Sequence, residues 1–163
     1  MTKTTLGGLL EQSMRMDETT WARHANPWSV WTRIPILPLL ALAIFSRTWI
    51  GWRCLVPIAA LVVWTYINPR AFPPPPHLDS WSARGVMGER LWLARYETPI
   101  PKHHERMAAI LSISAGIGVA VLAYGLIVLD GWATVAGVAI ALGAKLWFVD
   151  RMVWLWDEVA TSR

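Results

Sequence analysis

The most regular pattern in the chain is a pair of long apolar segments in its C-terminal half. Residues 107–129 (MAAILSISAGIGVAVLAYGLIVL) contain no charged side chain, and about 20 such residues cross the hydrocarbon core of a bilayer as a helix. Another apolar segment, residues 131–149, follows across the sequence LDGW. So short a connection forces two consecutive helices into an antiparallel hairpin.

Small residues recur at helical spacing along both segments of this hairpin. Lipid provides no hydrophobic force between helices, so close approach of two backbones supplies much of the packing energy. We therefore expect contact through Ser114, Gly118 and Gly125 on the first helix and Ala133, Gly137, Ala141 and Ala144 on the second. Lys145 lies near the predicted end of the second helix, where its long stem reaches the headgroups at modest cost.

Two weaker apolar segments lie in the N-terminal half, at residues 28–46 and 50–67. Prolines interrupt both, and each carries one arginine, Arg33 or Arg53. The sequence SRTWIGWR joins them and predicts a second tight hairpin. A re-entrant hairpin is the alternative, but its tip would place Arg47 and Arg53 deep in lipid. We therefore favour full crossing.

Residues 68–106 form a long polar connection between the two predicted hairpins. The sequence NPRAFPPPPHL predicts a stiff, extended polyproline stretch that cannot be helical. The sequence SWSARGVMGERLWLARY predicts a short amphipathic helix, lying either on the lipid headgroups or against the ends of the spans. One face of that helix would carry Trp81, Gly85, Gly88, Trp92 and Tyr96.

These elements predict an all-α integral membrane protein with four spanning helices in a single domain over residues 1–163. Composition agrees, because 55% of the residues are hydrophobic and 16% are charged, against about a quarter charged in soluble domains. With four spans, both termini and the 68–106 connection share one side of the membrane. Of the 15 lysines and arginines, only Arg47 and Arg53 lie on the other side. The positive-inside rule then places both termini and residues 68–106 in the cytoplasm of a multi-pass cell-membrane protein.

The chain contains 12 tryptophans. Most cluster at the ends of predicted spans, as in the aromatic belts of membrane proteins. A tryptophan-lined platform that binds a sugar or a cofactor is the more specific alternative. We favour the aromatic belt, because it explains most of the tryptophans without a ligand. The residues near span ends are Trp28, Trp31, Trp49, Trp52, Trp64, Trp132, Trp147, Trp154 and Trp156.

The histidines are the first candidates for chemistry, and all four lie on the predicted cytoplasmic side. None lies in mid-membrane, which excludes haem held by two histidines inside the bundle. His24, His103 or His104 could hold a metal ion together with Glu89 or Glu105. Neighbouring helical residues point about 100° apart, so we expect that His103 and His104 do not easily share one ion.

The sequence has neither HExxH nor CxxC, and it identifies no cofactor. Interfacial histidines hydrogen-bonded to loop carbonyls or to lipid phosphates are the alternative to a metal site.

Three further clusters contain charged residues that are candidates for binding, catalysis or structural ion pairs. Arg33 could hold an anionic headgroup. Glu89 and Arg90 could serve as acid–base and anion-binding groups, or form a solvated charge pair. Asp150 and Arg151 are adjacent, so they point apart and have separate partners, Asp150 being suited to an arginine of the 68–106 connection.

The sequence lacks GxSxG, a Walker loop and a dinucleotide fingerprint. Its pI is about 9.7, but the basic residues flank membrane segments. Anionic lipid headgroups are therefore expected partners, nucleic acid is not, and a protein partner or a second copy of the chain remains open.

Several motifs together resemble a family of small prokaryotic membrane proteins of unknown function. They are HANPWSVWTR, NPRAFPPPP, GERLWL, PIPKHH and KLWFVDRMVWL, and the resemblance runs from about Trp21 to Asp157. It implies a multi-span membrane protein and assigns no activity to any residue.

Two functional hypotheses follow. The first is a non-catalytic membrane component that binds lipid or a partner protein. The alternative is an enzyme or redox/metal protein that acts on a lipid-like substrate through His103, His104 or His24 with Glu89. A small transporter is least favoured, because the spans lack polar residues suited to a site at the membrane midplane.

Overall fold

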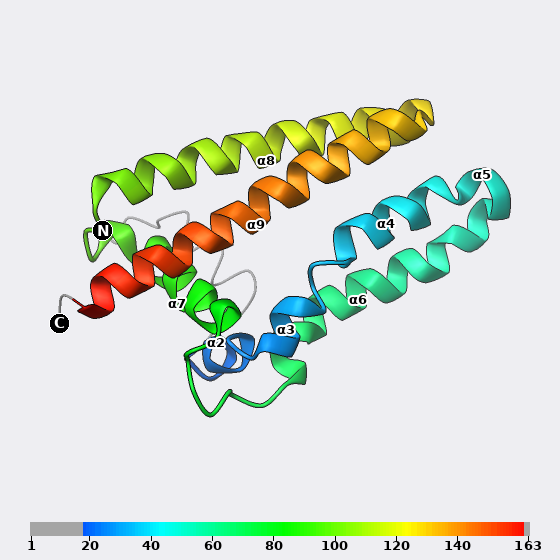
Figure 1. Ribbon diagram of the computed structural model, residues 1–163. Coiled ribbons are helices and arrows are strands. Elements are labelled where there is room, and N and C mark those ends of the chain that lie inside the picture. The colour runs from blue at the N-terminus through cyan, green and yellow to red at the C-terminus, as the bar shows by residue number, and fades with distance from the viewer. Residues whose placement is uncertain (1–17, 162–163) are drawn as a thin grey trace, which may run out of the picture.

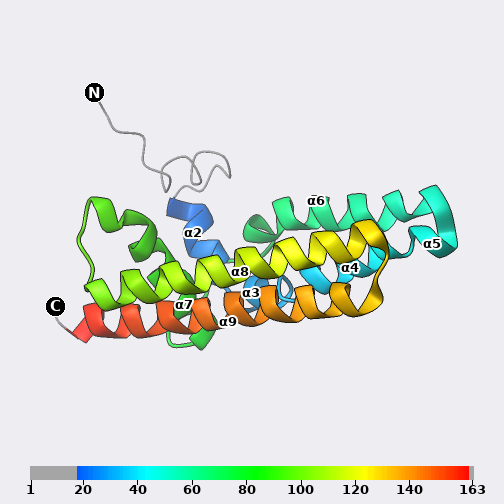
Figure 2. The ribbon, with the colours of Figure 1, turned by 90° about the horizontal axis from the view of Figure 1, so that it is seen from above.

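The computed structural model describes residues 18–161 and is all-helical there, with no β-strand, as the sequence predicted (Figure 1). Figure 2 shows the same elongated molecule from above. Its elements are α2 (Glu18–His24), α3 (Pro27–Trp31), α4 (Ile36–Phe45), α5 (Arg47–Ile50), the 3-10 helix η1 (Gly51–Cys54), α6 (Leu55–Ala71), α7 (Trp81–Leu93), the 3-10 helix η2 (Ala94–Tyr96), α8 (Lys102–Val128) and α9 (Gly131–Thr161).

Three segments are long and apolar enough to cross a membrane: Pro27–Ala71, Lys102–Val128 and Gly131–Ala160. The first contains both N-terminal predicted spans, and within it α4 and α6 pack against each other in opposite directions (Figure 1). The 17 residues of α6 extend about 25 Å, whereas the 10 residues of α4 extend about 15 Å. A hydrocarbon core is about 30 Å thick, so α4 would need α3 and α5 on either side of it to complete a crossing.

The pair α8 and α9 is joined as tightly as the sequence LDGW predicted. Leu129 adopts a left-handed conformation with φ 60° and ends α8. Asp130 then starts α9, because its Oδ1 accepts a hydrogen bond of 2.9 Å from the backbone N–H of Ala133. A side-chain oxygen in this position satisfies one of the free N–H groups of a helix start.

Glycines let α8 and α9 approach closely. A Cβ atom at Gly118 would overlap the backbone of Ala141, and one at Gly125 would overlap the backbone of Thr134. In the other direction, a Cβ at Gly137 would overlap Leu122. The predicted packing through small residues is therefore present at three levels of the pair.

Helix α7 packs against α9 (Figure 1), which is the second of the two alternatives drawn from its sequence. A Cβ at Gly88 would overlap the carbonyl of Met152, and one at Gly85 would lie 2.6 Å from Cγ1 of Val149. Tyr96 lies beyond α7 in η2 and is exposed, so it does not extend the buried face.

The extended proline stretch begins later than the sequence predicted. Helix α6 continues through Pro69 to Ala71, and the chain becomes extended only at Phe72. Asn68 explains the difference: it is completely buried, and its side chain hydrogen-bonds to Ser29 and Thr32. These contacts hold the last turn of α6 in place although Pro69 cannot donate a backbone hydrogen bond.

One arginine connects the two far ends of the helix pairs. Nη2 of Arg47, at the start of α5, donates a hydrogen bond of 2.6 Å to the carbonyl of Leu126 near the end of α8. A cation near the C-terminus of a helix is stabilised by the helix dipole and satisfies carbonyls that lack a helical partner. This contact gives a structural reason for one of the two arginines that depart from the positive-inside pattern.

Candidate functional site

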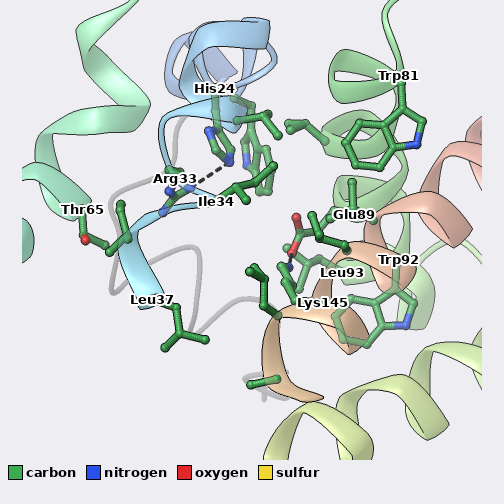
Figure 3. Close-up of a pocket in the computed structure, with 18 of the residues that line it drawn as sticks. His24, Arg33, Ile34, Leu37, Thr65, Trp81, Glu89, Trp92, Leu93 and Lys145 are labelled. Atoms are coloured by element: carbon green, nitrogen blue, oxygen red, sulfur yellow. Dashed lines mark hydrogen bonds and ion pairs between the residues drawn. The ribbon is translucent and has the colours of Figure 1, made fainter. Parts of the chain in front are cut away.

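A cavity of about 560 Å³ lies between the N-terminal helices and α9, close to the end of the molecule where α2, α3 and α7 gather (Figure 3). Apolar side chains form most of its wall, including Leu37 and Leu40 of α4 and Leu142 and Leu146 of α9. Four ionisable side chains, His24, Arg33, Glu89 and Lys145, also line it. The cavity therefore combines an apolar wall with a charged cluster formed by His24, Arg33, Glu89 and Lys145.

Glu89 and Lys145 form one half of this cluster. Nζ of Lys145 on α9 lies 2.9 Å from Oε1 of Glu89 on α7, and both side chains remain partly exposed. Burial raises the pKa of Glu89, but Lys145, His24 and Arg33 together hold that pKa below its ordinary value. Glu89 is therefore an ionised carboxylate at neutral pH.

Arg33 and His24 form the other half. Nη1 of Arg33 lies 2.9 Å from Nε2 of His24, and Nδ1 of the same ring lies 2.9 Å from Oγ of Ser29. Burial and the charge of Arg33 lower the pKa of His24 from 6.5 to about 4, so the ring is neutral at pH 7. A guanidinium only donates hydrogen bonds; hence Nε2 accepts and Nδ1 carries the proton.

The hydrogen bonds continue from His24 in one direction through the protein. Oγ of Ser29 donates to Oδ1 of Asn68 at 2.9 Å, and Nδ2 of Asn68 donates to Oγ1 of Thr32 at 2.7 Å. Oγ1 of Thr32 donates in turn to the carbonyl of Trp28 at 2.6 Å. This chain of hydrogen bonds fixes the orientation of the imidazole, which in turn positions the guanidinium of Arg33 at the cavity.

Sequence reasoning named His24, Arg33 and Glu89 but missed Ser29, Thr32 and Asn68. A signal for these three was present, since they are polar residues at the ends of otherwise apolar segments. Polar groups that become buried between helices are rarely left without hydrogen bonds, so polar residues in such segments predict a network. Neither their partners nor the link from Glu89 to Lys145 can be read from sequence spacing.

His103 and His104 lie elsewhere, at the start of α8, and both approach the end of α9. Nε2 of His104 is 3.0 Å and Nε2 of His103 is 3.4 Å from the same oxygen, Oε2 of Glu158. Both histidines thus contact one carboxylate oxygen, although we expected that they would not easily share one metal ion. Glu158 was not among the predicted ligands, whereas Glu105, which was, is exposed and not part of this group.

The chain has relatives by sequence. Residues 6–163 match a family of unknown function, DUF6653. The chain belongs to the DUF6653 family. No curated protein and no solved structure matches it. Membership of DUF6653 confirms the resemblance to an uncharacterised family and assigns no residue a role, so any function of this DUF6653 chain has to be argued from its own geometry.

The remaining candidates of the DUF6653 chain have structural partners. Asp150 accepts a hydrogen bond of 2.9 Å from the indole Nε1 of Trp81, so its partner in the 68–106 connection is a tryptophan and not the arginine we expected. Arg151 stacks on Trp154, with its Cζ 4.6 Å from the ring centroid. The two side chains thus have separate partners, as their adjacency predicted. Arg90 pairs with Glu18 and not with Glu89.

The predicted catalytic residues consequently occupy two places. Lys145, beside Glu89, and Glu158, beside the two histidines, are separated by about 20 Å along α9 at about 1.5 Å per residue. His24 and Glu89 line the cavity, whereas His103 and His104 lie at the end of the α8–α9 pair. A single site that uses all four residues does not fit this arrangement.

Proposed function

We propose that this chain is a four-span membrane protein that binds one lipid-like molecule with an anionic headgroup in the cavity between its helix pairs. The observation that carries the proposal is the lining of the cavity, where apolar helix faces meet a charged cluster. Ligand sites have this character: mostly apolar walls with a few placed polar groups. The role is binding within the membrane, without a chemical step.

The tryptophans of α9 support a membrane-spanning placement. Trp132 and Trp147 are 86% and 53% exposed and lie near the two ends of the predicted span at residues 131–149, which is about 27 Å long at about 1.5 Å per residue. That length is close to the thickness of a hydrocarbon core of about 30 Å, whose two boundaries attract tryptophan. Lys145 lies about one turn from the end of this span, close to Trp147 in the sequence.

The same placement puts both termini and the 68–106 connection on one side of the membrane. We assign this side to the cytoplasm, because it carries most of the lysines and arginines. The α4–α6 and α8–α9 pairs are then two transmembrane hairpins, and the cavity opens between them toward the cytoplasmic leaflet.

Charge supports an anionic ligand. Arg33 and Lys145 bring two positive charges to the cavity and Glu89 one negative charge, while His24 is neutral. One positive charge is left over, and a guanidinium binds phosphate or carboxylate oxygens through paired donors. The indole N–H of Trp21, another lining residue, has no acceptor among the described residues. A headgroup oxygen would satisfy such donors while the acyl chain lies against the leucines.

A lipid-converting enzyme is the second candidate function, favoured by the ionised carboxylate of Glu89 in a largely apolar cavity. A titratable group held in such a cleft by specific charge partners is typical of catalytic sites. We rank binding first, because both ring nitrogens of His24 are engaged by Ser29 and Arg33. The imidazole is thus committed to positioning Arg33 and does not serve Glu89 as an acid–base partner.

Native mass spectrometry of the protein purified in mild detergent tests the proposal. We expect one anionic lipid to remain on the wild-type chain, and Arg33→Gln to reduce its occupancy at least about tenfold at equal lipid concentration. Arg106→Gln is the matched control, since it removes one exposed arginine from the start of α8 and should leave occupancy unchanged.

Equal retention by all three proteins would mean that the lipid sits on the outer surface, and the cavity proposal would be abandoned. A chain that carries no lipid, or that instead carries one stoichiometric protein partner, would overturn it as well. Conversion of an added anionic lipid that stops in Glu89→Gln would replace binding with the enzymatic alternative.

A further inference from the structure

We infer that His103, His104 and Glu158 form a binding site for one divalent transition-metal ion at the end of the α8–α9 pair. The site is separate from the lipid cavity and does not depend on it. Its ligand set would be two imidazole nitrogens and one carboxylate oxygen, contributed by the first turn of α8 and the last turns of α9.

Distances between the donor atoms support the site. The two Nε2 atoms lie 3.0 and 3.4 Å from Oε2 of Glu158, and all three candidate ligand atoms lie within 4.8 Å of one another. Ligands of a tetrahedral zinc ion, bound at about 2.0–2.2 Å, are about 3.3 Å apart. Only small side-chain rotations would therefore bring the three atoms onto one ion.

The two histidines reach this arrangement because they occupy the first turn of α8. The backbone N–H of His104 donates to the carbonyl of Pro101 at 3.0 Å, so the turn is already formed. The ring centroids are 4.1 Å apart. A metal ion would bind both rings through their neutral imidazole nitrogens.

Surrounding contacts hold the ligands in place from both helices. The side chain of His104 is only 3% exposed, so its ring has little freedom. On α9, Leu155 is completely buried, and Asp157 forms an ion pair of 2.8 Å with Arg84 of α7. Glu158 is therefore carried on a helix that is anchored immediately before it.

Exposure and ligand chemistry indicate the kind of metal. His103 and Glu158 are 66% and 50% exposed, which leaves the outer side of the site open to water. Three protein ligands with a free position are typical of zinc sites that keep a bound water. Imidazole nitrogens with one carboxylate suit zinc, iron, cobalt, nickel or copper, whereas magnesium and calcium prefer oxygen ligands alone.

Metal titration of the full chain in mild detergent tests the inference, with a purification tag that contains no histidine. After treatment with chelator, wild-type protein should bind about one Zn²⁺ per chain, and Co²⁺ should give the visible absorption of an ion with nitrogen ligands. His103→Ala and Glu158→Gln should each weaken Zn²⁺ binding at least about tenfold. Because His103 is exposed, its replacement should leave the fold intact, which circular dichroism and gel filtration check.

His77→Ala is the matched control, because it removes another exposed histidine, one that lies in the loop before α7. It should bind Zn²⁺ like the wild type. The inference is overturned if the wild-type chain binds no Zn²⁺, or if His103→Ala and Glu158→Gln bind it as tightly as His77→Ala. In that case the three side chains form only a hydrogen-bonded helix contact.

Discussion

Mild acid should destabilise the folded protein through His24. Burial and the charge of Arg33 lower the pKa of this ring from 6.5 to about 4 in the folded state. Between these two values the unfolded chain binds a proton that the folded chain does not. The free energy of unfolding therefore falls as the pH drops below about 6.5, and this loss is complete below about 4.

The size of the effect follows from the same two values. The whole fall in pKa corresponds to about 3 kcal/mol at about 1.36 kcal/mol per unit. Between pH 7 and pH 5, where carboxylates contribute little, the expected loss is about 2 kcal/mol. The charges that face His24 are those of Arg33, Glu89 and Lys145, and of these only Glu89 opposes the shift.

Reversible unfolding in mixed micelles at pH 7 and pH 5 measures this loss. His24→Gln keeps an amide able to donate to Ser29 and accept from Arg33, but it cannot titrate. Its free energy of unfolding should change by about 2 kcal/mol less than that of the wild type over this interval. His77→Gln, at an exposed position, should behave as the wild type does.

A direct titration of the histidine side chains by NMR gives the pKa itself. The resonance that disappears in His24→Gln should not move between pH 7 and pH 5. If it titrates near 6.5, or if His24→Gln keeps the pH dependence of the wild type, burial and Arg33 do not lower the pKa of His24, and the predicted destabilisation by acid is wrong.

Three substitutions test the contacts between helices by thermal or chemical unfolding in detergent. Gly118→Ala should lower the free energy of unfolding by about 1–3 kcal/mol, because the new Cβ overlaps α9. The control Gly116→Ala meets no atom within 4 Å and should be neutral or slightly stabilising. Equal effects of the two substitutions would contradict the glycine contact. Arg47→Gln should lower the free energy of unfolding by about 0.5–1 kcal/mol, because α8 loses the hydrogen bond at its C-terminal end. The control Arg53→Gln changes an exposed arginine and should lower it by less than half as much. Trp81→Phe keeps the ring but removes its hydrogen bond to α9, and about 1 kcal/mol should be lost; no change would mean that this bond does not anchor α7.

Local chemistry was sufficient to predict the α8–α9 pair. A charge-free apolar segment and the connection LDGW leave few other arrangements, and glycines at helical spacing indicate where two backbones meet. The same reasoning failed at Pro69, which proline chemistry excludes from a helix interior. There the buried side chain of Asn68 is bonded to α3 and the turn after it, and these distant contacts override the local preference.

The candidate site was predictable only residue by residue. His24, Arg33 and Glu89 could be predicted as candidates, because charged and imidazole side chains are costly to bury near apolar segments unless they have partners. Their assembly depends on Lys145, which lies far from all three in the sequence. For His103 and His104, the angle between neighbouring helical positions could not reveal that both imidazole rings reach one carboxylate on another helix.

The contacts of α9 have a consequence for the order in which the protein assembles during its synthesis. Helices α7 and α8 both pack on α9, and α9 follows both of them in the chain. Until α9 emerges from the ribosome, the glycine faces of α7 and α8 have no surface to close on, although α4 and α6 can already pair. Proteins fold progressively from the N-terminus as they are made. Release of the last helix should therefore complete the charged cluster and both helix contacts in a single late step.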